Sequence, residues 1–173
     1  MVRDEEIGRL IKYAQGLGVR VSFIASGDDA AGWTVDGSEI YISRKHNRSK
    51  IDIVLSLIHE IAHQLYFIHE KNRQPDLKFE EALDRQNLFD YDLAETPAPK
   101  THRKRILDVE VTSAEWWETI YKETNCSFPI WRLHAQKQFD LYQYQHYYKT
   151  GHFPNKKQKN LKFKEIRLHY KQK

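Results

Sequence analysis

The chain has 173 residues, a length typical of one compact domain. Hydrophobic residues make up 40% of it and include four Trp, ten Tyr and eight Phe, a composition that excludes a disordered protein. The net charge of +4 is unevenly placed, because residues 155–173 hold eight basic residues and one acid, which leaves −3 for the rest. We therefore expect a folded domain over residues 1–154 and a basic C-terminal tail over residues 155–173.

The start of the chain and its single cysteine favour the cytoplasm. Four charged residues stand at positions 3–6, where a secretory signal would need an apolar run. The most apolar stretch, residues 51–58, is far shorter than the roughly 20 residues that span a bilayer, so we expect no membrane contact. Cys126 has no partner for an internal disulfide, and any metal site must therefore use His and carboxylate ligands.

The first third of the chain predicts an α+β fold that begins with one helix and a small antiparallel sheet. Apolar residues at three- and four-residue spacing indicate a helix over Glu5–Gln15. Alternation of apolar and polar residues predicts a strand over Val19–Phe23. Two further strands, Trp33–Val35 and Glu39–Ser43, flank Asp36-Gly37, a dipeptide typical of a tight hairpin turn.

The next segment predicts a central helix. Ser49, with Asp52 three residues later, is a suitable N-cap for a helix that runs to about Ile68. Its residues are apolar on nearly every side, so we expect it in the middle of the domain. The remaining predicted elements are a short helix near Phe79–Leu83, a loop over Asp90–Lys100, and helices over Arg103–Lys122 and Pro129–Tyr148.

The central helix carries the pattern His59-Glu60-Ile61-Ala62-His63. Side chains at positions i and i+4 project from one face of a helix, so His59 and His63 can bind one Zn²⁺ together. Glu60 then stands beside the metal and can take a proton from a water that the zinc activates. The pattern predicts a zinc-dependent hydrolase with Glu60 as the general base.

A catalytic zinc needs a third protein ligand, and three residues are candidates. His69 has the spacing of the last metzincin His, but Tyr66 replaces the Gly that breaks that helix, and the chain has no Met beyond Met1 for the Met-turn. Glu110 lies on the apolar stripe of the helix over Arg103–Lys122, where an acid needs a partner. Glu115, on a more polar face, is the fallback.

With these residues in place, the chain resembles the ImmA/IrrE family of zincin-like metallopeptidases. The likeness covers residues 1 to about 125 and rests on the order of elements, the metal-binding helix, and a later helix with Glu110 followed by small residues at 113–114. It implies a zincin-like fold in which the sheet packs on the metal-binding helix, with further helices C-terminal. Zincin-like proteins of this length are common in phages and mobile elements.

The resemblance also implies a peptidase that acts on an intracellular protein, as family members cut transcriptional repressors. A substrate strand would then lie along the sheet edge near Ile40–Ser43, with its scissile carbonyl over the zinc. An oxyanion donor is needed as well. The candidates for that role are Tyr66, His102, His134 and Tyr142.

The basic tail supports an alternative function. Its lysines, interspersed with Leu161, Phe163, Ile166 and Leu168, suit contact with nucleic acid or with an acidic partner, or else belong to a solvated extension. In this alternative the chain is a nucleic-acid-associated protein on a zincin scaffold, and its zinc is not catalytic.

Overall fold

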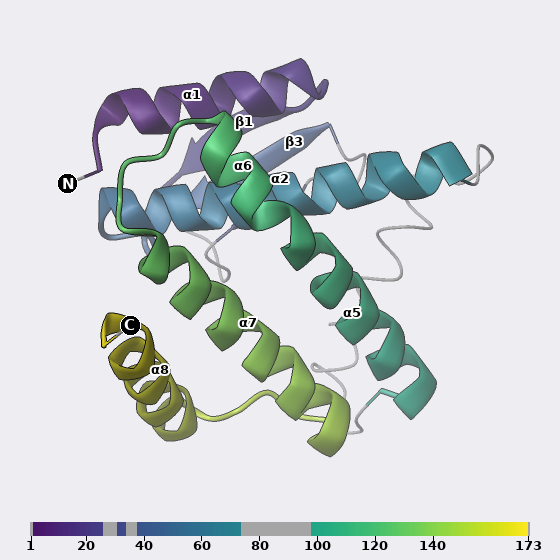
Figure 1. Cartoon of the computed structure of the whole chain (residues 1–173). Helices are drawn as coiled ribbons and strands as arrows, with labels where there is room; N and C mark the ends of the chain where they lie inside the picture. The colour runs from purple at the N-terminus through teal and green to yellow at the C-terminus, as the bar shows by residue number, and fades with distance from the viewer. Residues whose placement is uncertain (1, 26–30, 34–37, 74–97, 173) are drawn as a thin grey trace.

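The computed structural model describes residues 2–25, 31–33, 38–73 and 98–172, which form a mostly helical α+β fold with one three-stranded sheet (Figure 1). The predicted turn at Asp36-Gly37, the helix near Phe79–Leu83 and nearly all of the loop over Asp90–Lys100 lie outside these residues. The described elements are α1 (Asp4–Gly16), β1 (Arg20–Ile24), β2 (Ala31–Trp33), β3 (Glu39–Ser43), α2 (Lys50–Arg73), α5 (Lys100–Ser113), η1 (Ala114–Trp116), α6 (Trp117–Glu123), α7 (Ile130–Thr150) and α8 (Lys156–Lys171).

The sheet is mixed, so the prediction of a fully antiparallel sheet is wrong, whereas the predicted antiparallel pairing of the second and third strands is confirmed. Strand β3 pairs in parallel with β1 and antiparallel with β2, in the order β1-β3-β2. The chain between β1 and β3 spans residues 25–38, and a connection of a dozen residues or more permits parallel pairing. Because β3 is the middle strand, Ile40–Ser43 is not the sheet edge at which a substrate strand was expected.

Helix α2 is the centre of the fold, as predicted. It contacts α1, β2, β3, α5, η1 and α6, and its side chains from Val54 to Ile61 include four fully buried apolar residues. Its N-cap is also confirmed, because the Ser49 backbone N–H and hydroxyl both donate to the Asp52 carboxylate, at 3.0 and 2.7 Å. The helix continues to Arg73, one turn past the predicted end.

By length and composition, α2 is also the one helix of the described residues that could cross a membrane. Its most apolar window has a mean hydropathy of 1.3, and 56% of that window is buried inside the fold. Packing against α1, the sheet and α5 covers this apolar surface, which is the pattern of a core helix.

The helix predicted over Arg103–Lys122 is interrupted. Residues Ala114–Trp116 form a 3₁₀ turn between α5 and α6, and the chain keeps its overall direction through that turn (Figure 1). The predicted inward face holds on both sides of this turn, because Ile106 and Glu110 before it and Trp117 after it are all buried. A projection of one continuous helix could not foresee the turn.

Helices α7 and α8 lie side by side at the C-terminal end of the chain (Figure 1). The prediction for α7 is confirmed, and Gly151 ends the helix in the left-handed conformation with φ 84°. The described part of the predicted tail, residues 155–172, is not a solvated extension, because α8 packs on α7. The Phe163 ring lies 4.8 Å from the Phe139 ring, and Ile166 is buried.

A buried carboxylate ties α1 to the segment between α6 and α7. Glu6 is fully buried and accepts hydrogen bonds from the Ser127 backbone N–H and hydroxyl, both at 2.8 Å, and from the Arg3 N–H at 3.0 Å. Burial raises the pKa of Glu6, but these hydrogen bonds outweigh burial and lower it below 4.5.

We expect Glu6→Gln to lower the free energy of unfolding by about 1–3 kcal/mol at pH 7, because a charged acceptor is lost from two buried donors. A lowered folded-state pKa stabilises above the unfolded pKa, and that contribution disappears as the pH falls through the folded value. Urea titrations at several pH values should show the deficit shrinking in acid. Glu5→Gln, at a side chain that is 72% exposed, is the control, and an equal deficit there would contradict the expectation.

Candidate metal centre

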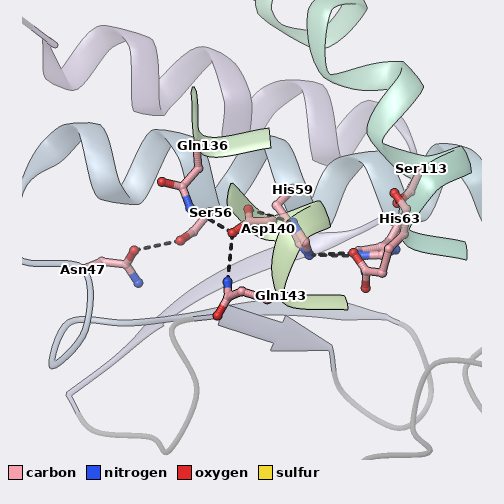
Figure 2. Close-up of polar contacts among 9 residues, drawn as sticks. Asn47, Ser56, His59, His63, Ser113, Gln136, Asp140 and Gln143 are labelled. Carbon is pink, nitrogen blue, oxygen red and sulfur yellow. Dashed lines mark hydrogen bonds and ion pairs between the residues drawn. The ribbon is translucent and has the colours of Figure 1, made fainter. Parts of the chain in front are cut away.

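Two histidines from one face of α2 form the base of the site. His59 and His63 are one turn apart, and their Nε2 atoms lie 3.0 Å from each other (Figure 2). Their rings meet edge to face, with centroids 4.7 Å apart. The i, i+4 spacing therefore directs two imidazole nitrogens to one point, as the sequence predicts.

Helix α5 brings a carboxylate to the same point. Glu110 Oε2 lies 3.8 Å from His59 Nε2, and Glu110 Oε1 lies 3.5 Å from His63 Nε2. One donor atom from each of these three residues falls within 4.8 Å of the others, which is close enough to hold a metal ion. Glu110 and His63 are each 6% exposed, so the site is formed inside the fold.

The donor set fits a tetrahedral metal. Bonds of about 2.0–2.2 Å to imidazole nitrogen and carboxylate oxygen place tetrahedral ligand atoms about 3.3 Å apart. The two Nε2 atoms lie 3.0 Å apart, and each has a different Glu110 oxygen at 3.5 or 3.8 Å, so neighbouring donors are close to this separation. Three protein ligands leave a fourth position for water or substrate.

The other two candidate ligands lie elsewhere. Because α2 continues without a break, His69 is carried to an exposed position, where its Nδ1 lies 3.5 Å from Glu70 Oε1. Glu115 is exposed on the 3₁₀ turn η1. Of the three residues considered for the third ligand, the structure brings Glu110 to the histidines.

Burial and like charges set the electrostatics of the centre. Burial lowers the pKa of His59 to about 4, and burial together with His59 lowers that of His63 well below 6.5, so both rings are neutral donors of electron pairs. Burial raises the pKa of Glu110 well above 4.5, and the nearby carboxylates Glu60 and Asp140 raise it further. A cation would offset this repulsion.

Polar side chains anchor α2 to the sheet beside the site. Asn47 donates from Nδ2 to the Ser43 carbonyl at the end of β3 and accepts from the Ser56 hydroxyl of α2 at 2.8 Å (Figure 2). Trp117 of α6 packs edge to face on His59, with ring centroids 5.5 Å apart. These contacts fix the helix turn that carries His59.

Sequence reasoning missed two residues of α7 that reach the cluster. Asp140 Oδ2 lies 3.8 Å from His59 Nδ1, and the Tyr144 hydroxyl donates a hydrogen bond to the Glu110 carboxylate. A signal for Asp140 was present, because it is the one acid in the sequence from Ile130 to Thr150. The many aromatic residues near Asp140 in the sequence indicate a helix that packs on the core, and this interpretation draws attention away from the acid.

The four candidate oxyanion donors occupy different surroundings. His134 Nε2 lies 3.3 Å from Glu118 Oε1, and the Tyr142 ring lies beneath Lys162 Nζ at 5.8 Å. The remaining two are Tyr66, which is buried, and His102, which is half-buried. Their part in oxyanion binding stays a prediction.

Solvent reaches the centre from one side. The side chains of His59 and Asp140 are 19% and 18% exposed, whereas that of Glu110 is 7% exposed. A molecule from solution therefore meets the cluster at the His59 and Asp140 side. Comparisons of the chain with protein families, with curated proteins and with solved structures found no match.

Proposed function

We propose that this protein is a zinc-dependent peptidase of the zincin type, related to the ImmA/IrrE family. One observation carries the proposal: His59 and His63 from α2 and Glu110 from α5 place three donor atoms within 4.8 Å, with Glu60 buried beside them. Two imidazoles and a carboxylate with a free fourth position suit catalytic zinc. The order of helix, sheet, metal-binding helix and ligand-bearing helix also supports the kinship.

Each residue of the centre then has a separate part. Zinc, when bound, polarises a carbonyl and makes a water more acidic. Glu60 takes the proton of the attacking water and passes it to the nitrogen of the leaving amine, the work of a general base that becomes a general acid. Its 7% exposure and its charge repulsion with Glu110, which raises the pKa of that carboxyl group, support this role.

The sheet order changes where a substrate strand would pair. Strand β3 already has a partner on each side, so an added strand would have to extend the sheet at β1 or β2. We favour β2, because it contacts α2 as well as β3 and therefore lies closer to the metal-binding helix than β1, which packs on α1. A protein substrate with an extended segment suits this arrangement.

The experiment that tests the proposal is a metal analysis combined with a cleavage assay on the full chain. We expect about one Zn²⁺ per chain and hydrolysis of peptide bonds in a mixture of unfolded proteins, followed by mass spectrometry of the products. A chelator should remove both, and added Zn²⁺ should restore both. Zinc binding without cleavage of any protein or peptide library would contradict the peptidase assignment.

A second candidate function rests on α8. Lys157, Lys164 and Lys171 are exposed and stand seven residues apart, so they form one row on the face opposite the buried Ile166. A row of exposed lysines can contact the phosphates of a nucleic acid. This candidate is compatible with zinc at the centre, and it concerns a surface that the peptidase chemistry does not use.

We expect exchange of Lys157, Lys164 and Lys171 for Gln to weaken duplex binding and to reduce the slope of log K against log salt by up to about 2.7, or about 0.9 for each lost contact. Fluorescence anisotropy at several salt concentrations measures both. The control exchanges three exposed basic residues near α1 and α2, Lys12, Lys45 and Arg48, for the same change in charge. Equal losses in both variants would rule out a specific role for α8.

A further inference from the structure

Helix α7 presents a row of polar side chains to the metal centre. Asp140 accepts hydrogen bonds from Gln136 Nε2 at 2.9 Å and from Gln143 Nε2 at 3.4 Å, residues one turn before and one turn after it on the same helix. The free side of its carboxylate faces the ring of His59, with Oδ2 3.8 Å from Nδ1 (Figure 2). Nδ1 is the ring nitrogen that does not face the cluster.

The same helix also reaches the third ligand. One turn after Asp140, the Tyr144 hydroxyl donates a hydrogen bond to the Glu110 carboxylate. Because α7 packs alongside α5, this contact joins neighbouring helices. Two adjacent positions on one face of α7 therefore contact two different ligands.

We infer that α7 positions the metal ligands: Asp140 fixes the ring orientation and tautomer of His59, and Tyr144 fixes the carboxylate of Glu110. The inference rests on the proposed metal site. A proton on His59 Nδ1 directed to Asp140 leaves the Nε2 lone pair for the metal, and such partners of ligating histidines strengthen metal binding. The hydrogen bond from Tyr144 restricts the rotation of the Glu110 carboxylate.

The contacts argue against a purely structural part for Asp140. Gln136 and Gln143 belong to its own helix, so their hydrogen bonds orient the carboxylate without tying α7 to the rest of the fold. Its contact with α2 is with the ring of His59.

The experiment compares the zinc affinity of Asp140→Asn and Tyr144→Phe with wild type, by competition with a chromophoric chelator. We expect each variant to bind Zn²⁺ about 10- to 100-fold more weakly. The matched controls are Asp108→Asn, at an exposed acid of α5, and Tyr148→Phe, one turn further along α7. We expect both controls to bind as wild type does. Affinities for both test variants equal to those of the controls would overturn the inference.

Two further measurements separate positioning from stability. The visible absorption bands of bound Co²⁺ report ligand geometry, and we expect them to shift in both test variants while the melting temperature of the metal-free chain stays within a few degrees of wild type. Unshifted bands would overturn the inference, and Tyr144→Phe tests it if Asp140→Asn does not fold. These measurements report metal binding and not cleavage. A failure of the peptidase proposal would therefore leave their results unchanged, so the two proposals can fail separately.

Discussion

Glu60→Gln is expected to reduce kcat/KM for peptide cleavage by about 10²- to 10⁴-fold, the contribution of a positioned general base. Gln has nearly the shape of Glu but cannot accept a proton from water. Because Glu60 is 7% exposed and lies within the packed helix α2, the isosteric exchange preserves its surroundings. We expect the variant to retain one Zn²⁺ per chain, so the loss belongs to proton transfer and not to the metal.

The same exchange on the same helix provides the control. Glu70→Gln changes a carboxylate that contacts His69 and Arg73, ten residues beyond Glu60 and away from the cluster. It should cleave at the wild-type rate. Stopped time courses on a fluorogenic peptide, with zinc content measured on the same samples, give the comparison. Full activity in Glu60→Gln would contradict the general-base assignment and favour a zinc without catalytic use.

Local sequence signals predict well the part of the fold that carries the candidate metal centre. The spacing of His59 and His63 needs only a regular helix to bring two rings together, and the all-round apolar character of α2 predicts its central position. The inward position of Glu110 is predicted from its place in an apolar stripe. This prediction needs the chain to be helical for only about two turns around Glu110. Each of these features depends on residues that are close in sequence.

The features that the sequence does not predict depend on pairing between distant segments. The alternation of apolar and polar residues in Val19–Phe23 indicates a strand but not the strand that it pairs with. It therefore does not predict the parallel pairing of β1 with β3. The 3₁₀ turn at Ala114–Trp116 has no Gly or Pro to mark it. The proximity of Asp140 to the candidate metal centre depends on its contact with His59, which lies 81 positions earlier in the chain.

His63→Ala is expected to abolish zinc binding. His63 Nε2 lies 3.0 Å from His59 Nε2 and 3.5 Å from Glu110 Oε1, so its removal leaves two ligands for a metal that takes three. Zinc at 100 times the wild-type Kd should stabilise the wild-type fold by about 2.7 kcal/mol and the variant by almost nothing. Thermal unfolding with and without Zn²⁺ measures the difference.

Matched variants decide the ligand set by the same measurement. His69→Ala removes the exposed His on the same helix, and it should keep the full zinc-induced stabilisation, because His69 contacts Glu70 and not the cluster. Glu110→Gln should lose most of that stabilisation, whereas Glu115→Gln should retain it, since Glu110 is buried at the histidines and Glu115 is exposed on η1. If His69→Ala lost zinc and Glu110→Gln kept it, the metal would need His69 to turn inward, and α2 would have to break before that residue.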